Sequence, residues 1–180
     1  MKVVGEDGNE VPTGEIGTVY LKAPDQGKFQ YFKDDGKTDK AYRFGGEFFT
    51  LGDMGYVDED GYLFLADRSS DLIISGGVNI YPAEVDAVLL HHPAVADVAT
   101  VGIPNSEWGE EVRSVVLLKN TDEASEAMSA QLVAFCLEDL AKFKCPRKID
   151  FVDQLPRYDT GKIIRRQVRE KYWQGVDKKI

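Results

Sequence analysis

The sequence contains few of the residues that bind structural metals or form disulfide frameworks. Its 180 residues include two cysteines, Cys136 and Cys145, and two adjacent histidines, His91 and His92. One pair of cysteines makes neither a zinc site nor a disulfide framework, and neighbouring histidines on a helix point about 100° apart. We therefore expect buried, reduced thiols and no metal ion bound by this chain.

Long apolar runs are also missing. No stretch reaches the roughly 20 apolar residues that cross a bilayer. The first residues, MKVVGEDGNEVPTGE, lack the apolar stretch of a secretory signal. The sequence predicts no transmembrane segment and a cytoplasmic location.

Positive charge is scarce except near the C-terminus. The net charge is −9, yet residues 141–180 carry 12 Lys/Arg against 5 Asp/Glu. Such asymmetry indicates either an anionic ligand or partner near this segment, or a basic helix exposed to solvent. Composition alone leaves both interpretations open.

The first part of the chain has the composition of a small β-rich region. The stretch IGTVYLK (16–22) suits a strand, and Asp60-Gly61 lies between two strand-like runs, as in a β-hairpin. Residues 23–47 mix Gly, Asp and Lys without periodicity, which predicts a long surface connection. We expect residues 1–66 to be all-β and to form an incomplete piece of a barrel, because three or four strands make a poor independent core.

The remainder has the pattern of a compact α+β domain. Helices are predicted over 82–92, from about residue 126 with Met128, Leu132, Phe135 and Cys136 on one buried stripe, and over 162–173. Strands are predicted over 72–74, 95–103, 111–119 and 148–152. The predicted order after residue 70 is β-α-β-β-α-β-α, with helices packed on a small sheet.

Three local features could carry chemistry. Asp53 follows a glycine at a strand end, where a carboxylate could accept hydrogen bonds from a sugar diol. Asp67-Arg68 precedes an apolar run that ends in Ser75-Gly76-Gly77, and Lys162 follows a glycine in LPRYDTGKIIRR. Each has an ordinary alternative: a turn aspartate, a plain loop and a solvated surface lysine.

In combination these features resemble a known family. The motifs LGDMGY, ADRSSDLIISGGVNIYPAEVDAVLLHHPAV and KFKCPRKIDFVDQLPRYDTGKIIRR resemble, in order, the C-terminal part of AMP-forming acyl-CoA synthetases. These enzymes belong to the adenylate-forming superfamily. The resemblance runs from about Gly14 to Arg169. It implies an enzyme that activates a carboxylic acid, here a fatty or aryl acid, with ATP and Mg²⁺ and passes the acyl group to coenzyme A.

The resemblance also implies roles for individual residues in nucleotide binding. Asp53 matches the aspartate that holds the ribose hydroxyls, and Arg68 matches an arginine that assists at the ribose and phosphates. Leu65 matches an apolar residue near the nucleoside. Asp67 matches the hinge about which the small domain swings between the two half-reactions.

Further roles follow for the second part of the chain. Ser75, Gly76 and Gly77 match the loop that approaches the pantetheine tunnel of coenzyme A during thioester formation. Lys162 matches the lysine that contacts the carboxylate and the α-phosphate together during adenylation. A cation there relieves the repulsion between two anions that meet at one phosphorus.

The resemblance divides the chain into the β-rich end of a large domain (1–66), a hinge (67–70) and a small mobile domain (71–180). The family's phosphate loop and its Thr-Glu magnesium motif do not occur in the sequence. Ile74 replaces a lysine of some relatives and Ala66 replaces a common glycine. We expect a fragment that works with a missing N-terminal domain and is inactive alone.

Other interpretations remain at this point. The chain could be the tail of a peptide-synthetase adenylation domain, or a non-catalytic module whose basic end meets an acidic partner. Nucleic-acid binding is the weakest of them, because the total charge is acidic and no base-stacking aromatic platform is evident.

Overall fold

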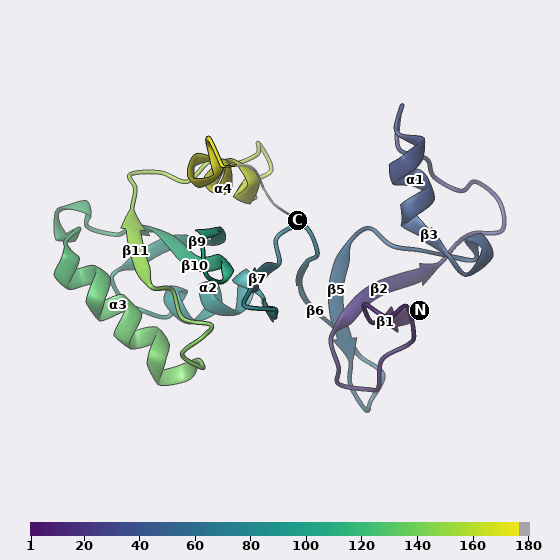
Figure 1. Ribbon diagram of the computed structural model, residues 1–180, viewed down its shortest axis with the longest axis horizontal. Coiled ribbons are helices and arrows are strands. Elements are labelled where there is room, and N and C mark those ends of the chain that lie inside the picture. Colours follow the sequence, from purple (N-terminus) through teal and green to yellow (C-terminus); the bar gives the residue numbers. More distant parts are fainter. Residues whose placement is uncertain (177–180) are drawn as a thin grey trace. The chain divides into compact units, whose positions relative to one another are not determined.

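The computed structural model divides into two compact units, Met1–Ser70 and Asp71–Ile180. We call them unit 1 and unit 2. The structure describes residues 1–176, so the last four residues of the basic segment 141–180 lie outside the described residues. The two units are shown in Figure 1. The predicted domain limits, with a hinge at 67–70, stay predictions.

Unit 1 is built on an antiparallel sheet of six strands in the order β3-β4-β2-β5-β6, with β1 also paired to β2. The strands are β1 (Lys2–Val4), β2 (Gly17–Lys22), β3 (Tyr42–Arg43), β4 (Phe48–Phe49), β5 (Asp53–Val57) and β6 (Leu63–Arg68). The predicted hairpin is β5-β6, and Gly61 in its loop has a φ of 83°. Positive φ explains the glycine at this position.

A helix lies within the segment predicted as a connection. Residues Asp35–Ala41 form α1, followed by a 3₁₀ turn at Phe44–Gly46. The Asp34 carboxylate accepts a hydrogen bond from the Lys37 N–H at 2.9 Å, which is an N-cap. Unit 1 is therefore β-rich, as predicted, but the prediction that it is all-β was wrong.

Unit 2 is a mixed α+β fold, which confirms the predicted class. Its sheet contains β7 (Ile73–Ser75), β8 (Val78–Ile80), β9 (Val95–Asn105), β10 (Gly109–Leu118) and β11 (Lys148–Phe151). Its helices are α2 (Pro82–Leu90), α3 (Glu126–Asp139) and α4 (Arg165–Trp173), with a 3₁₀ turn at Thr121–Glu123. The central strand β10 runs antiparallel to β9 and β7 and parallel to β11.

Two details of unit 2 differ from the sequence prediction. Strand β8 was not predicted, because Gly76-Gly77 was interpreted as a loop rather than as the turn of a β7-β8 hairpin. The last helix begins at Arg165 instead of Lys162. Residues 157–163 form a small closed loop before it, with Arg157 bridged to Ile163.

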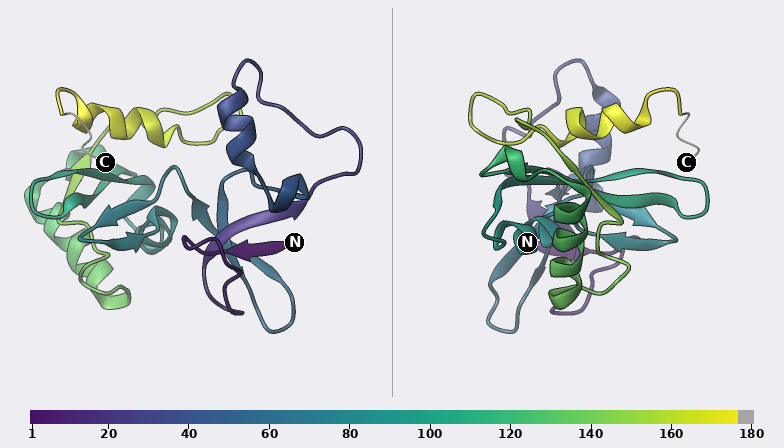
Figure 2. Two further views of the ribbon diagram at one scale, coloured as in Figure 1. Left: turned by 45° about the vertical axis from the view of Figure 1, so that its right-hand side comes forward. Right: turned by 90° about the vertical axis from the view of Figure 1, so that its left-hand side faces the viewer.

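Helices cover both faces of the unit 2 sheet. One core cluster joins α2 and α3 to the strands through Leu89, Val116, Leu132 and Cys136. A second joins α4 to the opposite side of β9 and β10, where Val101, Val115 and Val168 pack together. Side chains alternate between faces along a strand, which explains the division. Figure 1 and Figure 2 show α3 and α4 on different sides of the sheet.

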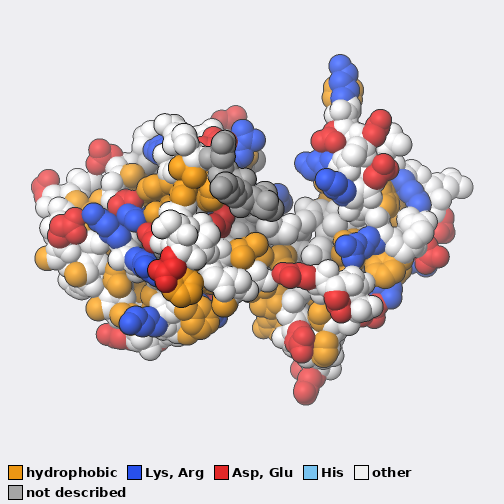
Figure 3. All heavy atoms as spheres, in the orientation of Figure 1, with side chains coloured by type: hydrophobic (Ala, Val, Ile, Leu, Met, Phe, Trp, Pro, Cys, Tyr) orange, Lys and Arg blue, Asp and Glu red, His pale blue; other side chains and the backbone are white. Residues whose placement is uncertain are grey.

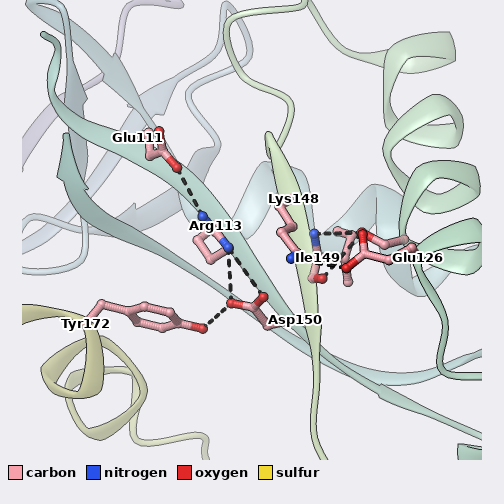
Figure 4. A network of polar contacts seen from close by, with 8 residues as sticks. Glu111, Arg113, Glu126, Lys148, Ile149, Asp150 and Tyr172 are labelled. Carbon is pink, nitrogen blue, oxygen red and sulfur yellow. Dashed lines mark hydrogen bonds and ion pairs between the residues drawn. The ribbon is translucent and has the colours of Figure 1, made fainter.

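A polar network also holds α4 on the sheet (Figure 4). Tyr172 donates a hydrogen bond of 2.6 Å to Asp150 of β11, and Arg113 of β10 lies 3.3 Å from the same carboxylate. Arg113 also pairs with Glu111 at 3.1 Å. Burial, followed by the hydrogen bond to Asp150, raises the pKa of the Tyr172 hydroxyl.

Polar side chains from α2 and α4 bind the backbone edge of β9 that does not face β10. The Thr100 N–H donates to Asp86 of α2 at 2.8 Å, and the Thr100 carbonyl accepts from Arg165 of α4 at 2.9 Å. Arg165 also pairs with Asp86. Trp173 donates its indole N–H to the Gly102 carbonyl at 3.0 Å. These contacts satisfy backbone groups that an exposed strand edge would offer to another chain.

Both cysteines are free and buried, as predicted. Burial is the main cause that raises the pKa of Cys136 to about 12, with smaller contributions from Cys145 and Asp139. Burial also raises the pKa of Cys145. Such thiols stay protonated and unreactive near neutral pH.

Among residues 1–176 no helix is long and apolar enough to cross a membrane. In the same residues no three side chains among His, Cys, Asp and Glu are arranged to hold a metal ion. Acidic and basic side chains are scattered over the face of both units seen in Figure 3.

Candidate functional site

Asp53 and Arg68 are brought together by the β5-β6 hairpin. They are direct partners across the two strands, and the Asp53 Oδ1 lies 3.5 Å from the Arg68 Nε. Their side chains are 34% and 62% exposed. An ion pair this open and long contributes little to stability, so both groups remain available to a ligand.

A groove of about 550 Å³ lies beside Arg68 within unit 1. Three cationic side chains, Lys37, Lys40 and Arg68, line it, and the Lys37 Nζ lies 4.1 Å from the centre of the Tyr31 ring. The other lining residues are Tyr31, Ala41, Thr50, Leu51, Gly52, Ser69 and Ser70. Three cations around one groove favour an anionic ligand such as a phosphate chain.

Sequence reasoning missed the two lysines of this groove. They lie on α1, in the segment that was interpreted as a loop. The signal that could have found them is Asp34, a typical N-cap residue directly before the helix. Leu65, predicted to lie near a nucleoside, is 63% exposed on β6 and does not line this groove.

Asp67 lies inside β6, where it is the cross-strand partner of Met54. A register irregularity follows on the partner strand between Met54 and Gly55. The limit between the two units falls after Ser70, three residues beyond Asp67. The role of Asp67 as a hinge stays a prediction.

Lys162 lies on the closed loop that precedes α4. The Tyr158 N–H donates to the Lys162 carbonyl at 2.9 Å, and the Gly161 N–H donates to the Tyr158 carbonyl at 2.8 Å. Gly161 has a φ of 84°, which explains the glycine before the lysine. Arg157 donates to the Gly161 carbonyl and pairs with Asp97 of β9, so the loop is tied to the sheet. The Lys162 side chain itself is exposed.

Ser75, Gly76 and Gly77 form the turn between β7 and β8. Ser75 pairs with Val78, so the two glycines make a two-residue hairpin loop with φ values of 59° and 79°. Positive φ at both positions is the geometry of a type I′ turn. The Gly76 N–H donates to the Trp108 carbonyl at 2.8 Å, and a Cβ added to Gly76 would lie 2.6 Å from the Trp108 ring.

A groove of about 710 Å³ opens beside this turn, wholly within unit 2. Most of its lining is apolar, with Trp108 and Phe143 as the large aromatic residues, and exposed Lys142 and Arg147 add positive charge. The remaining lining residues are Ser75, Gly76, Val78, Glu111, Val112, Val133, Leu137, Cys145 and Pro146. The groove can hold a ligand that combines an apolar or aromatic part with anionic groups.

The structure thus gathers the predicted site residues into two groups. Asp53 and Arg68 meet on unit 1, while Ser75–Gly77 and Lys162 belong to unit 2. Within unit 2 the turn and the lysine loop lie on separate elements, before β8 and before α4.

Comparison with known proteins defines the class to which this arrangement belongs. Residues 84–162 match the family described as the AMP-binding enzyme C-terminal domain. The ATP-bound MatB structure from Rhodopseudomonas palustris superimposes with a TM-score of 0.83 at 38% identity, over 95% of this chain and 33% of that chain.

Two curated relatives are acid–CoA ligases. The 2-succinylbenzoate–CoA ligase of Geobacillus kaustophilus is 47% identical over 164 residues, which cover 91% of this chain and 32% of the relative. A long-chain-fatty-acid–CoA ligase of Escherichia coli O6:H1 is 37% identical over 178 residues, which cover 99% of this chain and 30% of the relative. The chain contains an AMP-binding enzyme C-terminal domain, and both of these relatives, which it matches along nearly its whole length, are named as acid–CoA ligases. It spans about a third of the length of these relatives.

Proposed function

We propose that residues 1–180 are the C-terminal part of a longer AMP-forming ligase. In the first half-reaction a carboxylate oxygen attacks the α-phosphorus of ATP, pyrophosphate leaves, and an acyl-adenylate forms. In the second, the thiol of coenzyme A loses its proton to solvent, its sulfur attacks the acyl carbon, and AMP leaves with the electron pair of the broken C–O bond. The acid is fatty or aryl, in keeping with the substrates that the two relatives are named for.

The observation that carries this proposal is the groove beside the Ser75–Gly77 turn. Coenzyme A combines an adenine ring, negatively charged phosphates and a thin apolar arm. The groove offers the rings of Trp108 and Phe143 together with the cations of Lys142 and Arg147. Gly76 carries no side chain, which lets the Trp108 ring lie against the turn, while the space beside Gly77 is open.

Unit 1 would bind the nucleotide. Asp53 would accept hydrogen bonds from the ribose hydroxyls, and Arg68, with Lys37 and Lys40 in the same groove, would face the phosphates. Leu65 would lie against the nucleoside. Mg²⁺ would arrive with ATP, and we assign it no ligand among these residues.

Lys162 would act in adenylation only. Its loop is fixed at the base by Arg157 while its ammonium group is exposed, so the cation can enter an active site formed with another domain. There it would lie between the attacking carboxylate and the α-phosphate, where negative charge grows toward the transition state.

A change of domain orientation would separate the two half-reactions, since the turn and the lysine loop lie on different elements of unit 2. Asp67, in the last residues of β6, would absorb the rotation. Asp67→Pro fixes φ and removes an N–H, so we expect one half-reaction to fall much more than the other. Equal rates in both half-reactions would remove Asp67 from the mechanism.

The experiment that tests the proposal compares a full-length enzyme containing this chain with the isolated 180-residue chain. Acid-dependent ATP–pyrophosphate exchange and acyl-CoA formation are measured with a panel of aryl and fatty acids. We expect the full-length enzyme to support both reactions and the isolated chain neither. A full-length enzyme without exchange for any acid contradicts the reaction, and robust exchange by the isolated chain contradicts its dependence on a further domain.

A further inference from the structure

Glu110 is a buried carboxylate that reaches two different elements of unit 2. It is the second residue of β10 and only 7% exposed. Its Oε1 lies 2.5 Å from the Arg169 Nη2 of α4, and its Oε2 accepts a hydrogen bond of 3.3 Å from the Ile74 N–H of β7. A buried charge needs such partners, because desolvation without them is costly.

The neighbouring strand leaves room for this carboxylate. Gly102 of β9 has no Cβ, and one added there would lie 2.3 Å from the Glu110 Oε2. Gly102 does not have a positive φ. A glycine inside a strand without a special φ marks a close approach of another group. Gly102 therefore makes space for Glu110.

The two partners of Glu110 lie next to the two groups of unit 2 that the proposed function uses. Ile74 directly precedes the Ser75–Gly77 turn. Arg169 lies on α4, whose first residue is three positions after Lys162. Arg169 also lies over the Trp173 ring at 5.1 Å, and Trp173 is bonded to the Gly102 carbonyl. One side chain thus connects the strand of the turn to the helix of the lysine loop.

We propose that Glu110 is a positioning residue for both half-reactions, held in place by the space at Gly102. It fixes the position of β7 and its Ser75–Gly77 turn relative to α4 and the Lys162 loop that precedes this helix. The inference rests on the proposed function, because it assigns the turn to thioester formation and the lysine to adenylation. Small errors in placing reacting groups cost large factors in rate.

Two variants disturb this contact in different ways. Glu110→Gln keeps the shape but removes the charge, and its amide can accept at one atom only, so it satisfies Ile74 or Arg169 but not both. Gly102→Ala leaves Glu110 unchanged but places a methyl group where its carboxylate lies. The matched control is Ser129→Ala, because the buried Ser129 hydroxyl joins α3 to Ile149 of β11 and contacts neither the turn nor the lysine loop.

The rates of both half-reactions are measured in the full-length enzyme, with supplied acyl-adenylate for the second, together with thermal unfolding. We expect Glu110→Gln and Gly102→Ala to lower kcat in both half-reactions by about tenfold or more, with little change in KM. Ser129→Ala should lower the unfolding temperature while leaving kcat near the wild-type value. Wild-type kcat in both half-reactions for folded Glu110→Gln and Gly102→Ala would overturn the inference.

A second readout separates this inference from the proposed function. Amide hydrogen exchange is measured on the 180-residue chain, where we expect the Ile74 and Gly76 amides to exchange faster in Glu110→Gln than in wild type or Ser129→Ala. Unchanged exchange would overturn the positioning role even if the enzyme is a ligase. Absence of both half-reactions in the wild-type enzyme would contradict the proposed function, whatever the exchange result.

Discussion

Each unit contains an Asp–Arg ion pair, and the two pairs differ in the exposure of their side chains and in their backbone partners. In unit 2 the side chains of Asp86 and Arg165 are 9% and 19% exposed, and both bond to the backbone of Thr100. In unit 1 Asp53 and Arg68 are much more open and 3.5 Å apart. Residue type alone therefore does not tell a structural ion pair from a ligand-binding one; burial and backbone partners do.

The same contrast extends to the cores. The described part of unit 2, residues 71–176, has two clusters of buried hydrophobic residues, one on each face of its sheet. Unit 1 has fewer buried hydrophobic residues than unit 2: Val3, Val4, Val19, Tyr20, Ala23, Ala41 and Met54. Many of its aromatic rings instead contact one another near the surface, as Tyr56 and Phe64 do in a stacked pair. Unit 2 is a self-contained scaffold, whereas unit 1 has a thin core.

The largest expected difference between the units concerns the buried pair. Arg165→Met leaves the Asp86 carboxylate buried without its cation, and we expect a loss of about 3–5 kcal/mol in the free energy of unfolding. Both tryptophans, Trp108 and Trp173, lie in unit 2, so tryptophan fluorescence during urea unfolding reports on this unit. The matched change Arg68→Met should leave that transition in place. Equal effects of the two changes would contradict the contrast.

The second difference concerns the cores themselves. Leu132 is fully buried between α3 and the sheet, and Leu132→Ala should cost about 2–5 kcal/mol through lost contacts and a cavity. Val4→Ala removes a buried side chain from unit 1 and should leave the tryptophan-monitored transition of unit 2 unchanged. A joint shift of both transitions by either variant would show that the units unfold together.

The third difference concerns the pH dependence of stability, which we expect in unit 2 because Cys136 is buried there. The pKa of Cys136 is raised to about 12 in the folded chain from an ordinary value of 9.0. Between these values the unfolded state binds fewer protons than the folded state, so the free energy of unfolding falls as pH rises, by up to about 1.4 kcal/mol per pH unit for one group. Urea unfolding of unit 2 from pH 8 to 11 measures this slope.

Cys136→Ala should make that slope shallower without abolishing it, because the raised pKa values of Cys145 and Tyr172 act in the same direction. An unchanged slope in Cys136→Ala would show that this thiol does not cause the alkaline destabilisation.

The smallest expected effect on stability concerns the open pair of unit 1. Asp53→Asn should change the free energy of unfolding by at most about 1 kcal/mol, because exposed ion pairs contribute little. Far-UV circular dichroism during unfolding measures it. If Asp53 binds the ribose, the same variant should raise the KM for ATP strongly in the full-length enzyme. Large destabilisation with an unchanged KM would make Asp53 a structural residue.

Much of unit 2 could be predicted from the sequence, because its helices and strands have clear periodicity and cap residues. The helix predicted over 82–92 is present as α2, and Val85 and Leu89, four positions apart on it, are both fully buried. Strand β8 and helix α1 were missed for opposite reasons. Gly76 and Gly77 suggest a loop by composition, but they form the tight turn that leads into β8. Helix α1 has only seven residues in a charged segment without apolar periodicity, and the Asp34 cap stabilises it.

The contacts between distant parts of the chain could not be predicted from local patterns. Asp86 and Arg165 are 79 residues apart, and Glu110 and Arg169 are 59 apart. Nothing in the neighbourhood of either residue in the sequence indicates its partner, since only the folded sheet brings them together. The Asp53–Arg68 contact is the exception, because a hairpin fixes the register of its two strands.

The central claim is that Lys162 serves adenylation while the Ser75–Gly77 turn serves thioester formation. The most direct test measures both half-reactions of the full-length enzyme in Lys162→Ala. The account predicts that acid-dependent ATP–pyrophosphate exchange falls by orders of magnitude, while acyl-CoA formation from supplied acyl-adenylate continues near the wild-type rate. Normal rates in both half-reactions, or an equal loss in both, would contradict it.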